Sequence, residues 1–171
     1  MAADSRRRTP EPDRGHRIYA TQTVRISKVI GAPVDYVYAW CTDYRPDDSE
    51  LSVSRPKPRF QVVRLAPRRL LRIRVTDAGR RDPRVAVDLL RLQPPRSWHT
   101  DQIDEEDRES VDYRLTSLSP TRTRLDLLIT ERWVIPSPPS RADVRRRARG
   151  AWDRYALALE ERYRAGRPAR G

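Results

Sequence analysis

The sequence predicts an α+β domain in which a largely antiparallel sheet packs against one long C-terminal helix. Three observations lead to this fold class. Apolar and polar residues alternate with period two over about 75 residues from Phe60. The breaks within that stretch are short and rich in Pro, Gly and Asp, which favours hairpins. The C-terminal residues carry apolar side chains at helical spacing. A chain of 171 residues fits one domain of this kind.

The first elements are a strand and a short helix. The strand is expected at 22–30, where Val24 and Ile26 alternate with polar residues. A helix is expected from Pro33 to about Cys41, because proline is tolerated in the first turn of a helix. The acidic turn at 47–50 is expected to start a second short helix.

Six further strands follow in the period-two region. They are expected at 60–65, 70–76, 84–92, 97–103, 110–118 and 123–135, with the charged run 104–109 as a turn. Parity assigns the faces of each strand. Leu71, Ile73 and Val75 alternate with Arg72 and Arg74, so we expect an apolar face against the helix and a charged face in solvent.

A long helix is expected at 141–164. Ser140 is the predicted N-cap, and Asp143 stands three residues later, as in a capping box. The apolar positions of this helix form a single stripe, which needs the apolar face of the sheet as its partner. The members of the stripe are Val144, Ala148, Trp152, Tyr155, Leu159 and Tyr163.

With this order of elements, the chain resembles the START-like (SRPBCC) superfamily of helix-grip proteins, and within it the polyketide cyclase/dehydrase-like branch. The resemblance rests on the run VRISKVIGAPVDYVYAW at 24–40, where Gly31, Ala32 and Pro33 match the family's helix start. It also rests on Asp43, which matches the Asp that closes the first helix. The strands and the terminal helix extend it, in order and patterning, to residues 18–165.

The resemblance implies a helix-grip fold, which is a curved seven-stranded antiparallel sheet around a long C-terminal helix, with two short helices after the first strand. In many relatives a cavity between sheet and helix holds an apolar small molecule. It implies no particular reaction, because relatives include carriers, cyclases, hormone receptors and proteins that bind macromolecules. We expect the domain at 18–165, between disordered tails at 1–17 and 166–171 that lack periodicity.

Composition excludes several classes of protein. The single cysteine, Cys41, excludes a disulfide scaffold and a cysteine-based zinc site, and two histidines do not make a His-rich metal centre. The six glycines form no phosphate-binding loop, so no nucleotide cofactor is expected. Together with the cysteine and histidine counts, this leaves no cofactor and no metal expected. No run of 18 apolar residues occurs, and the opening residues are charged where a signal peptide is apolar. We therefore expect a soluble, cytoplasmic protein without a transmembrane segment.

Glu131 is the leading candidate for a binding site. The parity of Leu127 and Ile129 places Glu131 and Trp133 on the inner face, where a carboxylate needs a partner or anchors a ligand. The alternative is a bulge that turns Glu131 to solvent, or an arginine that neutralises it. The other expected ligand contacts are Tyr113 as a polar anchor and apolar walls from Val37, Leu127, Ile129, Trp133, Trp152 and Tyr155.

His99 is the second candidate. It shares a strand face with Asp101, and an imidazole beside a carboxylate can act as a base or bind a polar group. We expect His99 at the rim of the cavity, with a satisfied surface histidine as the alternative. If the protein is an enzyme, Glu131 and His99 are the candidate acid or base.

Basic residues are concentrated near the C-terminus. The net charge is +12, from 36 Lys and Arg against 24 Asp and Glu, and residues 137–171 hold ten Arg and four acids. The sharpest cluster is a candidate contact for nucleic acid or an anionic surface, with a solvated helix face as the alternative. Its members are Arg145, Arg146, Arg147 and Arg149.

Three functions stay open on the sequence alone. The favoured one is binding of a hydrophobic or amphipathic small molecule, lipid-like or polyketide-like, between sheet and helix. The alternatives are a polyketide cyclase/dehydrase-like enzyme and a protein that contacts RNA or the ribosome through the Arg-rich helix. The sequence fixes no oligomeric state.

Overall fold

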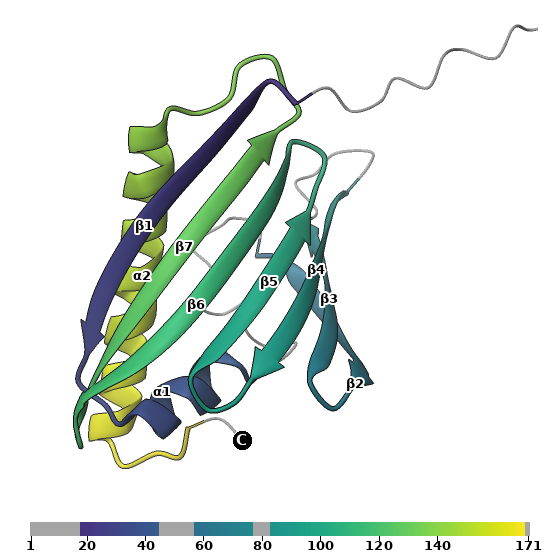
Figure 1. Ribbon diagram of the computed structural model, residues 1–171. Coiled ribbons are helices and arrows are strands. Elements are labelled where there is room, and N and C mark those ends of the chain that lie inside the picture. The colour runs from purple at the N-terminus through teal and green to yellow at the C-terminus, as the bar shows by residue number, and fades with distance from the viewer. Residues whose placement is uncertain (1–17, 45–56, 77–82, 170–171) are drawn as a thin grey trace, which may run out of the picture.

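The computed structural model describes residues 18–44, 57–76 and 83–169. A seven-stranded antiparallel sheet curves around a long helix (Figure 1). The strands are β1 (Ala20–Ile30), β2 (Arg59–Ala66), β3 (Arg69–Thr76), β4 (Arg84–Gln93), β5 (Ser97–Ile103), β6 (Asp107–Ser119) and β7 (Arg122–Trp133), and the helices are α1 (Val34–Cys41) and α2 (Arg141–Arg164). The predicted α+β helix-grip class is confirmed. The short helix expected at 47–50 lies outside the described residues.

The strand order is β1-β7-β6-β5-β4-β3-β2. Strands β2 to β7 therefore pair with their neighbours along the chain, as the short breaks predicted. The first strand pairs with the last, in register from Ala20 opposite Trp133 to Ile30 opposite Thr123. This pairing brings the two ends of the domain together and places β1 and β7 beside α2 (Figure 1).

The acidic run 104–109 is only partly a turn, so the predicted start of β6 is wrong. The Asp104 carboxylate accepts the backbone N–H groups of Glu106 and Asp107 at 2.7 and 3.0 Å. An aspartate that bonds to the backbone in this way closes a tight turn. Residues 107–109 therefore belong to β6, where alternate side chains face the inside of the sheet.

The start of α2 confirms the predicted cap. Ser140 Oγ accepts the backbone N–H of Asp143 at 3.1 Å, and the Asp143 carboxylate accepts the backbone N–H of Ser140 at 3.3 Å. This reciprocal capping box satisfies two backbone donors that have no partner within the helix. It fixes where α2 begins, and thereby which of its residues lie over the sheet.

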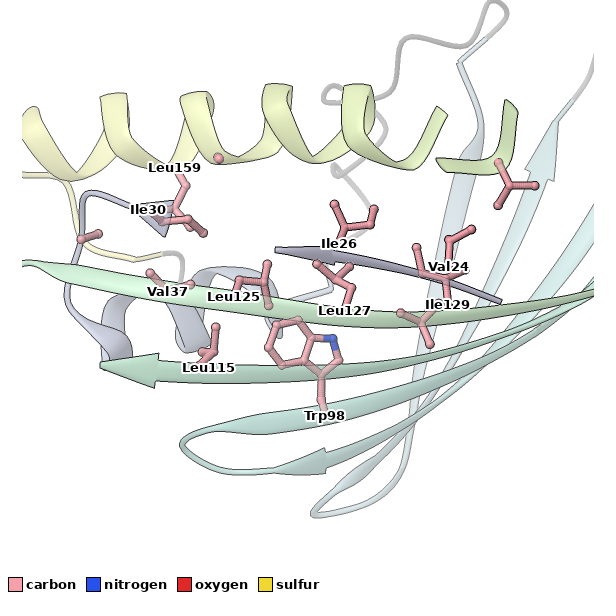
Figure 2. Packing of buried hydrophobic residues seen from close by; sticks show 14 residues of the cluster. Val24, Ile26, Ile30, Val37, Trp98, Leu115, Leu125, Leu127, Ile129 and Leu159 are labelled. Carbon is pink, nitrogen blue, oxygen red and sulfur yellow. The ribbon is translucent and has the colours of Figure 1, made fainter. Parts of the chain in front are cut away.

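The core lies between α2, α1 and the β1–β7–β6 side of the sheet. Figure 2 shows Leu159 of α2 close to Ile30 of β1, above Leu125 and Leu127 of β7. Val37 of α1 is also fully buried in this cluster. Most contacts of the two helices lie on this side, and Tyr38 of α1 also contacts Trp98 of β5. The concave face of β3, β4 and β5 lines the cavity described below.

The predicted faces of β3 are reversed. Arg72 and Arg74 lie on the inner face and line the cavity, so Leu71, Ile73 and Val75 face outward. Alternation in a strand shows which residues share a face, but which face is buried depends on what packs against it. On this half of the sheet no described helix covers the inner face, so charged side chains are hydrated there or paired with each other.

Residues 166–168 of the expected C-terminal tail are bonded to the domain. The Tyr36 hydroxyl donates a hydrogen bond to the backbone carbonyl of Arg167 at 3.0 Å. The Arg162 guanidinium donates one to the carbonyl of Pro168 at 2.9 Å. The tail at 1–17 and residues 170–171 lie outside the described residues.

Candidate ligand-binding cavity

A cavity of about 600 Å³ lies between the concave face of the sheet and the N-terminal half of α2. Its volume is within the range of small-molecule sites. Trp40 and Cys41 at the end of α1 and Tyr44 just beyond it close one side. The cavity is thus formed where the curved sheet moves away from α2.

Aromatic rings form a continuous wall of this cavity. Trp98 of β5 stacks on Tyr113 of β6, with ring centroids 4.4 Å apart and planes 8° from parallel. Tyr113 contacts Trp152 at 5.8 Å, and Trp152 contacts Tyr155 at 5.6 Å. Trp40 completes the wall 6.3 Å from Tyr155. Rings arranged in this way offer flat apolar surface to a ligand.

Glu131 lies at the polar end of the cavity, as the parity of β7 predicted. Its side chain is 2% exposed, and its Oε1 accepts a hydrogen bond from Arg147 Nη2 at 2.8 Å. The Arg147 side chain is 56% exposed and also lies 5.7 Å from the centre of the Trp133 ring. Glu131 Oε2 is buried without a hydrogen-bond partner among the described residues. An arginine therefore neutralises Glu131, which was the alternative considered from the sequence, yet half of the carboxylate faces the cavity unpaired.

Two further carboxyl groups stand beside Glu131. Glu109 of β6 is directly opposite Glu131 in the antiparallel register, and Asp107 is opposite Trp133. Burial, and then the charges of Glu131 and Asp107, raise the pKa of Glu109 to about 8. Burial, and then the charge of Asp104, raise the pKa of Asp107 to about 7. Like charges at opposed strand positions repel, so protons are retained at this end of the cavity at neutral pH.

A buried ion pair forms a second polar region of the cavity. Arg72 Nε donates to Asp88 Oδ2 at 2.5 Å, and Asp88 is 1% exposed. The Arg72 guanidinium lies between the rings of Tyr44 and Phe60, 5.0 and 5.1 Å from their centres. Asp88 Oδ1 has no partner among the described residues. This pair holds β3 to β4 from the inside and leaves one acceptor facing the cavity.

The expected ligand contacts divide into residues that line the cavity and one that does not. The lining includes Tyr113, Leu127, Ile129, Glu131, Trp133, Trp152 and Tyr155. Burial raises the pKa of Tyr113, although a hydrogen bond with Thr100 opposes that effect. Val37 is a correction, because it is fully buried in the core beneath the cavity and does not line it. It sits on the face of α1 that packs against β6 and β7, where no space is left for a ligand.

His99 is a second correction, because it lies on the outer face of the sheet. Its Nδ1 is 2.7 Å from Asp112 Oδ1, and its Nε2 is 3.0 Å from Asp101 Oδ1. Partial burial opposes a charge on His99, but the bonds to Asp112 and Asp101 outweigh it and raise the pKa of the imidazole. Ser110 Oγ is 3.5 Å from Nε2. Both ring nitrogens of His99 face carboxylate oxygens, so neither is free to accept the proton of Ser110, and these residues do not form a nucleophilic triad.

Sequence reasoning missed several residues that line the cavity. Trp98 lines the cavity. It precedes His99 in β5 and therefore faces the opposite side of the sheet, so placing the polar His99 outside would have placed Trp98 inside. Asp107 and Glu109 were assigned to a turn, and the cross-strand register that brings them to Glu131 needs the pairing of β6 with β7. The pair of Arg72 and Asp88 also depends on register, since the two residues are opposed in β3 and β4.

The four candidate polyanion contacts are all exposed on α2, and two of them have carboxylate partners. Arg147 is bonded to Glu131 at the cavity, and Arg146 to Asp143 of its own helix. Arg145 and Arg149 are exposed on α2.

Neither described helix combines the length and the apolar character needed to cross a membrane. No three His, Cys, Asp or Glu side chains in the described ranges are grouped so that they could hold a metal ion.

No family model matches the sequence. No curated protein matches it either. The Zhui aromatase/cyclase from Streptomyces sp. R1128 superposes with a TM-score of 0.68 at 15% sequence identity, over 86% of this chain and 98% of that one. A START superfamily protein from Mycobacterium smegmatis gives 0.57 at 15% identity, over 82% and 95% of the two chains.

The di-domain ARO/CYC StfQ from the steffimycin biosynthetic pathway gives a TM-score of 0.62 at 14% identity, over 85% of this chain and 52% of that one. At sequence identities this low, the superpositions establish the fold alone, and the function has to be argued from the site. The chain therefore has the helix-grip fold of the START-like (SRPBCC) proteins, shared with aromatase/cyclases, as its sequence predicted.

Proposed function

We propose that the protein binds an amphipathic small molecule, lipid-like or polyketide-like, in the cavity between the sheet and α2. The observation that carries the proposal is the cavity of about 600 Å³, which has an aromatic wall and buried polar atoms without hydrogen-bond partners in the described part of the chain. In this proposal Glu131 and Tyr113 orient the ligand, and Leu127, Ile129 and Trp152 contact its apolar body. Two structural neighbours, described as an aromatase/cyclase and a di-domain ARO/CYC, support a ligand with an aromatic or cyclising body.

Intrinsic fluorescence tests the proposal directly. All four tryptophans of the chain line the cavity. A naphthol added to the protein is expected to quench or shift their emission in a saturable way, because a ring that enters the cavity contacts the indoles. Native mass spectrometry of protein purified from its own host would identify a resident ligand. Emission that changes only in proportion to added naphthol, together with an empty protein, would contradict the proposal.

A second candidate function is acid-catalysed loss of water from a polyketide-like ligand. It is favoured by the Glu109 carboxyl, which keeps its proton at neutral pH because burial and neighbouring charges raise its pKa to about 8. This proton can be given to a leaving hydroxyl oxygen, while a carboxylate takes a proton from the adjacent carbon.

Replacing Glu109 distinguishes an enzyme that uses Glu109 as its acid from a protein that only binds the ligand. We expect Glu109→Gln to keep the affinity for an uncharged naphthyl β-hydroxyketone within about twofold and to slow its dehydration by about 100-fold, since general acids contribute this much. Mass spectrometry follows the lost water. Asp126→Asn is the control, because Asp126 pairs with Arg124 on the outer face. Equal rates in both variants would remove Glu109 from the chemistry.

Macromolecule binding through α2 is the weaker alternative, since Arg147 and Arg146 already have carboxylate partners. Contact with nucleic acid or an anionic surface and the cytoplasmic location both stay predictions from the sequence.

A further inference from the structure

We propose that the polar end of the cavity takes the positively charged nitrogen of its ligand, so that the ligand is an amine with an aromatic or apolar body. This inference rests on the proposed small-molecule binding and adds the charge of the ligand. The site is the carboxyl cluster, which we define as Asp107, Glu109 and Glu131.

The carboxyl cluster has more acidic groups than nearby cations. Arg147 is bonded to one oxygen of Glu131 and is itself half exposed at the mouth of the cavity. The turn before β6 adds Asp104 and Glu106, and Arg84 Nη2 of β4 is paired with Glu106 at 2.7 Å. These groups, with the neutral Gln102 of β5, line the same end of the cavity. A cation placed there would lie near five acidic side chains and two guanidinium groups, those of Arg84 and Arg147, so attraction exceeds repulsion once the cluster is ionised.

Two oxygens of the carboxyl cluster still need donors. Glu131 Oε2 and Asp107 Oδ1 are buried and have no partner among the described residues, and the side chains that carry them are 2% and 7% exposed. Buried acceptors without donors are costly. The proton retained on Glu109 can serve only Glu131 and leaves Asp107 Oδ1 without a donor among the described residues. An ammonium group supplies three, whereas a ligand hydroxyl supplies one.

Because Glu109 and Asp107 retain protons at neutral pH, binding of a cation to the cluster is expected to release protons, which can be measured. The pKa values of Glu109 and Asp107 are raised to about 8 and about 7 by burial and by their acidic neighbours. A positive charge within a few ångströms favours the ionised carboxylates, which lowers these values. Binding of an amine at neutral pH therefore releases protons, and binding of a neutral or acidic ligand does not.

The walls next to the cluster suit the rest of such a ligand. Trp133 is opposite Asp107 in the register and already carries one cation, Arg147, over its ring. Cations bind favourably to the faces of such rings. The stacked pair Trp98 and Tyr113 continues the wall away from the cluster. An aromatic body joined to the nitrogen by a short linker would place both parts on matching surfaces.

Three matched probes test the inference on the full chain. They are 1-naphthylmethylamine, 1-naphthalenemethanol and 1-naphthoate, which share a ring system and differ in charge. Calorimetry at pH 7 in phosphate and in Tris gives the affinity and the protons released. We expect the amine to bind about tenfold more tightly than the alcohol, the gain of a hydrogen bond to a charged group. We also expect the buffer dependence of the heat to show proton release for the amine and none for the alcohol.

Variants assign that preference to the cluster. Glu131→Gln and Glu109→Gln keep the side-chain size, and each is expected to reduce the preference for the amine over the alcohol severalfold. Asp126→Asn on the outer face is expected to leave it unchanged, and thermal unfolding checks that each variant is folded.

The outcomes separate the two proposals. Equal binding of all probes without proton release overturns the inference on charge and leaves small-molecule binding intact. Tightest binding of the naphthoate also overturns it and assigns the ligand contact to Arg147. If no probe changes tryptophan emission or gives heat, both proposals fail.

Discussion

Replacing Arg72 by methionine is expected to lower the free energy of unfolding by about 3–5 kcal/mol, the usual cost of breaking a buried ion pair. The reason is Asp88, which is 1% exposed and has Arg72 as its partner at 2.5 Å. Without the guanidinium, a carboxyl group stays buried between β3 and β4 with no charge to balance it. The variant also loses the contacts of Arg72 with the rings of Tyr44 and Phe60.

Urea unfolding at pH 7 measures the loss in free energy of unfolding, and two further variants serve as controls. Arg72→Met combined with Asp88→Leu is expected to recover most of the stability, because neither charge is then left alone. Arg124→Met removes an exposed arginine from its pair with Asp126 and is expected to cost less than about 1 kcal/mol. A loss for Arg72→Met no larger than that of Arg124→Met would mean that water reaches Asp88 and that the pair is not a structural contact.

Stability is expected to fall as the pH rises from about 5 to 8. The pKa of Glu109 is about 8 in the folded protein and 4.5 in its ordinary state. Between these values the folded protein holds a proton that the unfolded chain has released. Each pH unit therefore favours unfolding by on the order of 1 kcal/mol. Asp107, with a raised pKa of about 7, acts in the same direction over the lower part of this range.

Glu109→Gln is expected to flatten this pH profile and to be more stable than the parent protein at pH 8, since the amide never takes a charge. Urea unfolding at pH 5, 6, 7 and 8 compares the two proteins. His99→Gln is the control for the outer face, because the raised pKa of His99 also favours the protonated folded state. Parallel profiles for the parent and Glu109→Gln would show that Glu109 is hydrated and ionised in the folded protein.

The two halves of the sheet explain why the sequence predicted one part of the site and not the other. On β7, Leu125, Leu127 and Ile129 pack against α2 or line the cavity below it, so their parity correctly placed Glu131 and Trp133 inside. On β3 the same reasoning failed. Arg72 points inward, where Asp88 lies opposite it on β4 and pairs with its charge.

The local rules of the chain determined the elements of this protein. Period-two alternation, turn residues, Pro33 before α1 and the Ser140 cap of α2 depend on neighbours in sequence. Apart from the start of β6, the described strands and helices appear where these signals predicted them. Only the tertiary structure decided the chemistry of the cavity. Glu109 meets Glu131 through the register of β6 and β7, and His99 lies on the outer face of β5, where it is bonded to Asp112 and Asp101. Contacts between residues far apart in sequence arise from strand pairing and curvature, which alternation along a single strand does not encode.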